Sequence, residues 1–281
     1  MCEPGWHPGP ALAVPQGAGQ DGRRGTGRPS PMARRGSGWY SGTVELTDFE
    51  ALSFDCYGTL IDWEAGLLAV FGPWARARGL DVTGEELLAD YAGIEAAVEA
   101  EHPADPYPEI LARGMRFLGE ALGAEVTAAD AARLAGSVPD WPPFPDAHDA
   151  LAALGRRFKL IILSNVDRAS FAGSNARLGV EFTSVITAQD VGAYKPSPRN
   201  FDALAREAAR LGIRPGGLLH VAQSLFHDHV PAKRAGLPTV WIDRRRDRDG
   251  WGATPPPPAP VTPDWEFGSM AAFAAAAAPP V

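Results

Sequence analysis

The chain has 281 residues, 45% of them apolar, which is enough for one main hydrophobic core and a smaller second one. Its formal net charge of −8 excludes binding modes that neutralise a phosphate backbone or an anionic membrane surface, so we expect neither nucleic acid nor membrane as a partner. The two cysteines, Cys2 and Cys56, lie far apart and predict no disulfide framework. The N-terminus lacks the apolar core of a signal peptide, which indicates a cytoplasmic protein.

Both ends of the chain have unusual composition. Residues 1–43 are crowded with Gly, Pro, Ser and Arg, show no hydrophobic period, and are predicted to be a disordered extension. Residues 251–281 are rich in Pro and Ala. Their alanine run, 271–278, is weakly hydrophobic and is followed by two prolines, so we interpret the whole segment as a frayed tail.

Five short apolar runs between these ends predict buried parallel strands, at 51–54, 160–163, 184–187, 218–221 and 239–242. Helical stretches separate most of them, at 145–156, 168–178, 198–211 and 228–235. This alternation predicts an α/β fold with a doubly wound parallel sheet of the Rossmann type. Ligands bind to such sheets at the carboxyl ends of the strands.

A long insertion separates the first two predicted strands, by roughly a hundred residues where a crossover needs far fewer. Residues 64–140 are rich in Ala, Leu and Glu, with helical spacing at 85–99 and 108–122. We therefore expect a helical cap at 64–140 and a core domain made of 44–63 and 141–250. A cap that closes over a pocket would exclude water from the chemistry.

The strongest motif follows the first predicted strand. Asp55 stands just past the strand end and points into the expected crevice, and Gly58 and Thr59 follow in a tight turn. The turn amides and the Thr59 hydroxyl can hold an anionic group beside the carboxylate. An Asp-x-x-Gly-Thr match alone is weak, because Asp and Gly are ordinary turn residues.

Polar residues also follow three later strands. Ser164 and Asn165 come after 160–163, Lys195 precedes a proline, and Asp228 begins the helix after 218–221. Alone, each has an ordinary reading as a helix cap or a solvated charge. Their common place at the carboxyl ends of strands indicates one site.

Taken together, these residues resemble the haloacid dehalogenase superfamily, over roughly residues 52–244 and including the cap inserted after the first strand. The resemblance implies that Asp55 is a nucleophile that forms a covalent ester. It further implies that Ser164 binds the anionic group of the substrate and that Lys195 steadies the charge of Asp55, with Thr59 beside them in the catalytic set.

Two departures from the superfamily pattern decide the subgroup. Its phosphatases carry a second Asp where this chain has Tyr57, and a Gly-Asp pair where it has Ala222 and Gln223. Asp55 and Asp228 alone form a poor oxygen cage for magnesium, so no metal or other cofactor is expected. Tyr57 instead matches the Asp-x-Tyr-Gly-Thr form of the type II, or (S)-2-haloacid, dehalogenases. That resemblance implies a small 2-haloalkanoic acid as substrate, halide displacement by Asp55, and water activation near Asp228.

The match to that branch is incomplete. Its cap arginine has no clear counterpart between residues 82 and 101, Phe201 replaces a tyrosine, and Leu225 replaces an asparagine. His227 and His229 flank Asp228, and either is a general base near neutral pH or a surface helix residue. The catalytic set is thus Asp55, Thr59, Lys195, His227 and Asp228, and the expected substrate-binding residues are Tyr57, Ser164, Asn165, Phe201, Gln223 and Ser224.

Two other functions remain open on the sequence. One is a magnesium-dependent phosphatase with a degraded motif, against which Tyr57 and Gln223 speak. The other is a catalytically silent binding protein, against which the retained Asp55, Lys195 and Asp228 speak. The resemblance also suggests a homodimer.

Overall fold

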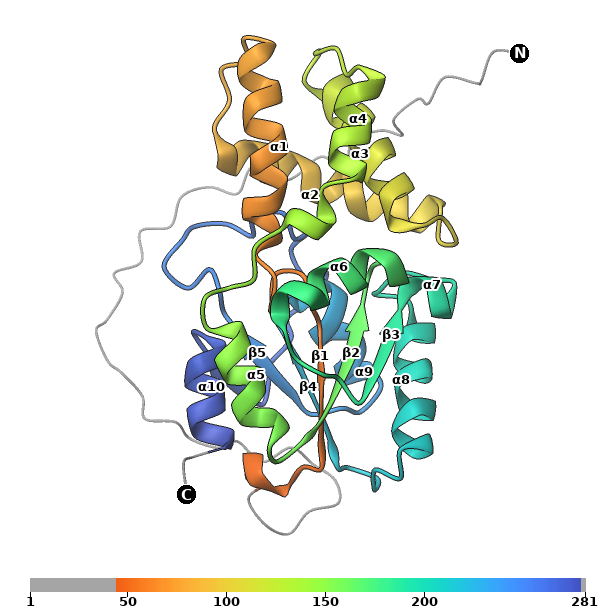
Figure 1. The fold of residues 1–281 in the computed structure, drawn as a ribbon, viewed down its shortest axis with the longest axis vertical. Coiled ribbons are helices and arrows are strands. Elements are labelled where there is room, and N and C mark those ends of the chain that lie inside the picture. Colours follow the sequence, from red (N-terminus) through yellow and green to blue (C-terminus); the bar gives the residue numbers. More distant parts are fainter. Residues whose placement is uncertain (1–43, 279–281) are drawn as a thin grey trace. The chain divides into compact units, whose positions relative to one another are not determined.

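The computed structural model describes residues 44–278, so the predicted disordered segment 1–43 lies outside the described residues. A single six-stranded sheet, with all neighbouring strands parallel, forms the centre of this part, in the order β3-β2-β1-β4-β5-β6 (Figure 1). The strands are β1 Ala51–Phe54, β2 Lys159–Ser164, β3 Ser184–Thr187, β4 Leu218–Ala222, β5 Thr239–Ile242 and β6 Trp265–Phe267. The predicted α/β fold is confirmed, and β1 to β5 match the predicted strands to within one residue at each end.

Helices cover both faces of the sheet, as a doubly wound fold requires. Leu52 and Ile162 pack in one core cluster with α5, α6 and α10, whereas Ala51 and Ile161 pack in the other with α8 and α9. None of the helices in residues 44–278 is long and apolar enough to span a membrane. The core helices are α5 Ala147–Gly155, α6 Arg168–Leu178, α7 Ala188–Val191, α8 Pro198–Arg210, α9 Val230–Arg234 and α10 Met270–Ala277.

The strand register brings the predicted site residues to one edge of the sheet. Phe54, the last residue of β1, pairs with Ile162 of β2 on one side and with Val221 of β4 on the other. Because the three strands are parallel, their carboxyl ends lie side by side. Asp55 therefore lies between the residues that follow β2 and those that follow β4.

Four helices between β1 and β2 lie beyond the carboxyl ends of the strands, at the place of the predicted cap, and we call them the cap (Figure 1). Capping boxes begin two of them, with Thr83 and Glu86 at the start of α2 and Thr127 and Asp130 at the start of α4. Gly66 lets α1 approach Trp141 closely, because a Cβ there would lie 2.2 Å from the Trp141 ring. The cap helices are α1 Trp63–Ala77, α2 Gly84–Glu101, α3 Tyr107–Ala121 and α4 Ala128–Ala135.

The prediction that 251–281 is a frayed tail was wrong. Within it, β6 extends the sheet beside β5, and α10 packs against α5. Met270 and Phe273 are fully buried, and Ala274 and Ala277 share their face of the helix. The spacing of these four residues makes an apolar stripe, and the small alanines allow close packing, so the helix is part of the core.

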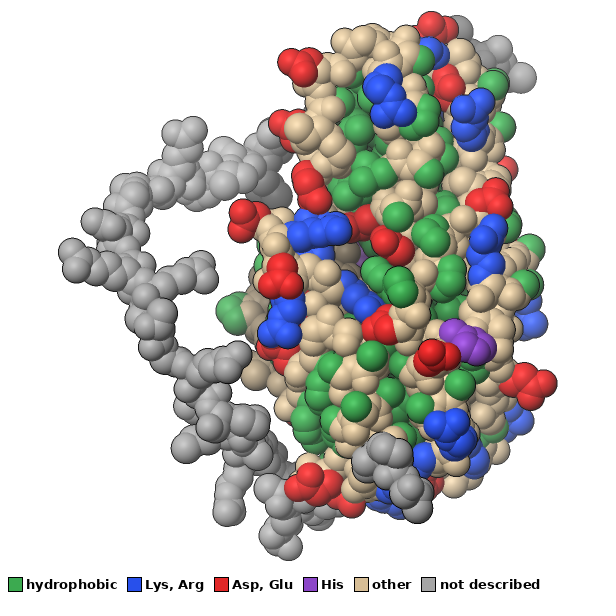
Figure 2. Space-filling model, turned by 60° about the vertical axis from the view of Figure 1, so that its left-hand side comes forward, with side chains coloured by type: hydrophobic (Ala, Val, Ile, Leu, Met, Phe, Trp, Pro, Cys, Tyr) green, Lys and Arg blue, Asp and Glu red, His purple; other side chains and the backbone are tan. Residues whose placement is uncertain are grey.

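The loop between β5 and β6 forms ion pairs and a hydrogen bond with the cap. Arg245 forms ion pairs with Glu64 of α1 at 2.6 Å and Glu85 of α2 at 2.5 Å, and the Ala253 N–H donates to Glu64. Figure 2 shows basic and acidic side chains adjoining one another at mid-height on one face. Since Arg245 and Glu64 are largely buried, this contact holds the loop against the cap.

Candidate active site

Asp55 lies at the end of β1 and is bonded from two sides. The Lys195 ammonium donates to Asp55 Oδ1 at 2.9 Å, and the Thr59 hydroxyl donates to Oδ2 at 2.6 Å. The turn that contains Gly58, with φ +89°, brings Thr59 back onto the carboxylate, a conformation that favours glycine. The Gln223 N–H in turn donates to Thr59 Oγ1 and fixes the hydroxyl toward Asp55.

Lys195 joins Asp55 to the second carboxylate, Asp228. Its Nζ lies 2.7 Å from Asp228 Oδ1 and 3.0 Å from the Leu163 carbonyl oxygen, so all three N–H groups have acceptors. His220 of β4 also bonds Asp228 Oδ1, at 3.0 Å through Nε2, and its Nδ1 lies 2.9 Å from the Ser53 hydroxyl. Asp228 Oδ2 is buried and has no partner. It is thus the one oxygen of Asp228 that no described residue bonds.

The charges in this group stabilise one another. Burial opposes ionisation of Asp228, but Lys195 and the His220 hydrogen bond hold the pKa of Asp228 below its usual value. Burial likewise favours neutral Lys195, but Asp228 and Asp55 together raise the pKa of the ammonium. Burial and the neighbouring Asp228 charge raise the pKa of Asp55, and Lys195 and Thr59 oppose that rise. Lys195 thus favours the ionised form of both carboxylates, and for Asp228 the lowering effects outweigh burial.

A cavity of about 40 Å³ opens over these groups, between the sheet edge and the cap. Its volume suits a few water molecules or a small organic acid rather than a large substrate. Seven predicted site residues line it, together with five that the sequence reasoning missed. They are Asp55, Tyr57, Asn165, Lys195, Ser224, His227 and Asp228 among the predicted residues, and Trp63, Glu95, Glu99, Tyr107 and Thr254 among the missed ones.

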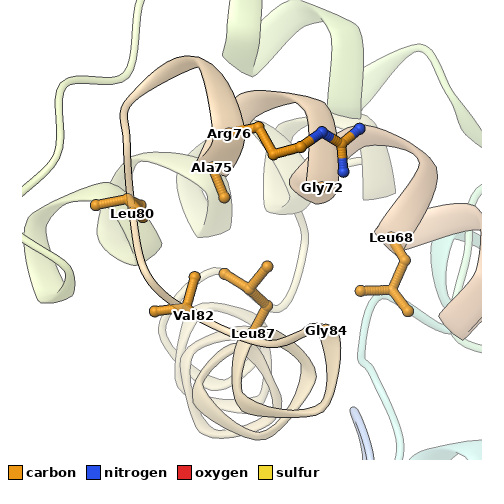
Figure 3. Close-up of a pocket in the computed structure, with 8 residues that line it drawn as sticks. All are labelled: Leu68, Gly72, Ala75, Arg76, Leu80, Val82, Gly84 and Leu87. Carbon is orange, nitrogen blue, oxygen red and sulfur yellow. The ribbon is translucent and has the colours of Figure 1, made fainter.

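A larger cavity, of about 260 Å³, lies within the cap, between α1 and the start of α2 (Figure 3). Its lining contains no carboxylate, hydroxyl or imidazole, and Arg76 is its one charged side chain. Leu68 and Leu87 point toward it. We therefore place the chemistry in the smaller cavity, which contains the reactive groups.

Thr59, Gln223 and Ser164 were also predicted site residues, and they do not line the cavity. Thr59 is buried behind the carboxylate, and Gln223 contributes its backbone N–H to Thr59 and its side-chain oxygen to the Thr254 hydroxyl. Ser164 is 1% exposed and its hydroxyl has no partner. Ser164 therefore keeps a free donor next to the site.

Two predictions need correction. Phe201 is not a substrate-binding residue, because it is buried in the core cluster under the sheet, where its ring packs against His220. His229 is directed away from the cavity and bonds the Ala222 carbonyl oxygen. His227 does line the cavity, but burial lowers its pKa to about 4, so it is a weaker base than predicted.

The residues present do not fit a magnesium site. At the place where phosphatases carry a second Asp, the Tyr57 hydroxyl bonds Ser174 at 2.8 Å, and its ring packs against Trp141. The Lys195 ammonium, and not a cation site, lies between Asp55 and Asp228. Within residues 44–278 no three His, Cys, Asp or Glu side chains are grouped so that they could hold a metal ion.

The chain is similar to several known proteins. A family model for haloacid dehalogenase-like hydrolases matches residues 49–225. Haloacetate dehalogenase H-2 of Moraxella sp. (strain B) is 28% identical over 203 residues, covering 71% of this chain and 88% of that protein. Phosphoglycolate phosphatase of Escherichia coli (strain K12) is 30% identical over 212 residues, covering 70% and 82%.

A solved structure shows the same fold. The L-2-haloacid dehalogenase of Xanthobacter autotrophicus superposes with a TM-score of 0.63 and 22% identity, covering 80% of this chain and 97% of that one. The family match covers more than half of the chain, and the six-stranded parallel fold agrees with it. The chain belongs to the haloacid dehalogenase-like hydrolases.

Proposed function

We propose that this hydrolase is a metal-independent dehalogenase that converts a small 2-haloalkanoic acid into the 2-hydroxy acid through an ester on Asp55. One observation carries the proposal. Lys195 bridges Asp55 and Asp228, while Tyr57 and Gln223 stand at the positions where a magnesium-dependent phosphatase needs carboxylates. The arrangement thus provides a nucleophile, Asp55, that is ion-paired with Lys195, and it leaves no place for a hard cation.

In the first step, a carboxylate oxygen of Asp55 attacks the carbon that bears the halogen. A carbon–oxygen bond forms, the carbon–halogen bond breaks, and the halide leaves with the bonding electron pair. Lys195 and Thr59 hold the two Asp55 oxygens in place through their hydrogen bonds. This orientation limits the attack to a defined direction.

In the second step, water attacks the carbonyl carbon of the Asp55 ester. When Oδ2 is the attacking oxygen, the carbonyl oxygen of the ester is Oδ1. Negative charge then develops on Oδ1, to which the Lys195 ammonium already donates, while Thr59 bonds the ester oxygen. The unpartnered Oδ2 of Asp228 accepts a hydrogen bond from the water, and the His227 imidazole also lines the cavity. The ester bond then breaks, the hydroxy acid leaves, Asp55 is restored, and one proton passes to solvent.

The haloacetate dehalogenase among the relatives supports a small haloacid as substrate, and the volume of the cavity agrees with it. The similarity to a phosphoglycolate phosphatase keeps phosphate-ester hydrolysis as the competing function. A direct comparison of halide and phosphate release decides between them.

The decisive experiment is a single turnover of a 2-haloacid, with enzyme in excess, in water enriched in heavy oxygen. Because water attacks the ester carbonyl, a peptide containing Asp55 is expected to gain one heavy oxygen, and Asp55→Asn is expected to abolish turnover. Label found only in the hydroxy acid would mean direct displacement by water, which excludes the covalent route.

A chelator provides the control for the second candidate. Halide release from 2-chloropropionate is expected to be unchanged after dialysis against EDTA, since the site residues do not fit magnesium. Loss of turnover with EDTA, restored by Mg²⁺ and accompanied by phosphate release from an aryl phosphate, would instead identify a phosphatase.

A further inference from the structure

Two buried glutamates form the cap side of the cavity. Glu95 and Glu99 lie one turn apart on α2, and each is 5% exposed. Glu95 accepts a hydrogen bond from the Tyr107 hydroxyl at 2.9 Å, and Glu99 accepts from the Asn165 amide at 3.2 and 3.3 Å. Both donors are neutral. Among the ion pairs of the described residues, none involves either glutamate, although buried carboxylates usually have a cationic partner.

Lys195, the cation of the site, has no N–H group left to donate to a glutamate. Lys195 donates its three N–H groups to Asp55, Asp228 and the Leu163 carbonyl. With every carboxyl ionised, the cavity would contain four negative charges against the single positive charge of Lys195. Such walls would repel the carboxylate of a haloalkanoate, so protons must reside on some of the four carboxyls for that substrate to bind.

Of the four carboxyls, Glu95 and Glu99 are the ones that we expect to be protonated. Asp55 must be ionised to act as a nucleophile, and Lys195 and His220 keep Asp228 ionised. Burial raises the pKa of Glu95 to about 7 and that of Glu99 well above its usual range, and the Glu95 charge raises Glu99 further.

The other titratable groups around the glutamates stay in one charge state. Tyr91 on α2, Tyr107 on α3 and Tyr194 before Lys195 all have a raised pKa, first because they are buried and also because the glutamate charges disfavour phenolate. Burial lowers the pKa of His227 across the cavity to about 4, so it is neutral. Glu95 is therefore the group of this wall whose pKa lies near neutral pH, and the pKa of Glu99 is raised in the same direction.

We propose that Glu95 and Glu99, in their neutral carboxylic acid form, are the subsite that receives the carboxylate of the substrate through O–H donors. This inference rests on the proposed function, because it assumes an anionic substrate. Asp228 Oδ2, which no described residue bonds, is left to the water in this scheme. Binding is consequently linked to protonation, and above pH 7 an anion enters with uptake of a proton.

Propionate tests the subsite without turnover, because it has the carboxylate but no leaving group. Its affinity is measured by calorimetry from pH 6 to pH 9, in two buffers of different ionisation enthalpy, which gives the number of protons taken up. For the wild type we expect the affinity to fall by about tenfold for each pH unit above 7 when one proton is linked. Proton uptake is expected to approach one per bound propionate.

Glutamine is a neutral isostere of the protonated acid, so the variant carrying Glu95→Gln and Glu99→Gln is expected to bind propionate equally from pH 6 to pH 9. At pH 9 it should bind at least about tenfold more tightly than the wild type. Glu101→Gln, an exposed change on the same helix, is the matched control and should keep the wild-type pH dependence. If the double variant does not fold, the single variants and the wild-type proton count still decide.

Three results would overturn the subsite. They are propionate affinity without pH dependence or proton uptake in the wild type, no propionate binding at any pH, and binding of ethylammonium in preference to propionate at pH 9. The last result would assign the glutamates to a cationic substrate. Proton-linked propionate binding without halide release would instead refute the proposed function and leave the subsite intact, so the two failures are distinguishable.

Discussion

Replacing Lys195 with methionine removes the charge at the centre of the site and keeps the length of the side chain. Lys195 is 1% exposed and bonds both Asp55 and Asp228. Without the ammonium, two buried carboxylates have no cation between them. The variant therefore tests whether Lys195 keeps these groups ionised and in place.

The magnitude is set by the two contact distances. At 2.9 and 2.7 Å and an effective dielectric constant of about 20, each ion pair has a Coulomb attraction of about 6 kcal/mol. Protonation and desolvation reduce the net effect, so Lys195→Met is expected to lower the free energy of unfolding by about 3–5 kcal/mol. The pKa values of both carboxyls rise in the variant, so the loss is larger at pH 8 than at pH 5. Loss of one donor to the developing oxyanion lowers kcat by about 10²–10³.

Urea unfolding at both pH values measures the first effect, and halide release from 2-chloropropionate measures the second. His227→Ala is the comparison, because His227 is a neutral imidazole bonded to Ser224, and its removal takes no charge from the site. We expect it to be less harmful to kcat. A folded Lys195→Met enzyme within tenfold of wild-type kcat would refute the role of Lys195, and a worse His227→Ala variant would make the histidine the water-activating base.

Two further predictions concern the C-terminal part of the chain. Truncation after Asp264 removes β6 and α10 and should lower Tm strongly. Because the Phe273 ring is fully buried, Phe273→Ala alone should lower the free energy of unfolding in urea by about 3–5 kcal/mol. An unchanged Tm would mean that α10 does not stabilise the core. Arg245→Met breaks the ion pairs to Glu64 and Glu85, so it should raise KM more than it lowers kcat and should speed proteolysis at residues 245–254. Unchanged kinetics and proteolysis would show that this contact does not hold the loop.

The sequence was a good guide to the sheet and a poor one to its last strand. Buried parallel strands are continuous apolar runs, so β1 to β5 could be located from hydrophobicity alone. β6 has three residues, none fully buried, and comes after a proline-rich loop, so it has no such run. The signal missed in α10 was the spacing of Met270, Phe273, Ala274 and Ala277 after the N-cap Ser269, which the high alanine content obscured.

For the site, hydrophobicity and strand order located the residues at the strand ends but not the cap residues that face them. Asp55, Lys195 and Asp228 could be grouped because parallel strands end at one edge. Glu95 and Glu99 lie on a cap helix, where glutamates at i and i+4 usually form a solvated face, and only the packing of the cap onto the core shows that they are buried. Phe201 was placed by resemblance alone, and the direction of α8 turns its ring into the core under the sheet.

Tyr57 stands where the phosphatases carry an aspartate, and its ring also contacts the cap. Its ring centroid lies 5.6 Å from that of Trp141 and 6.4 Å from that of Tyr107, and the Tyr107 hydroxyl donates to Glu95. An aspartate at this position would lose these ring contacts and would add a further negative charge to a cavity where Lys195 has no N–H left to donate. With Tyr57, the position therefore carries no carboxylate for magnesium, and the ring packs beside Tyr107, which donates to Glu95. Through Tyr107, Tyr57 therefore contacts the part of the cap that carries Glu95, and it does so as a neutral aromatic side chain beside four carboxyls and one ammonium.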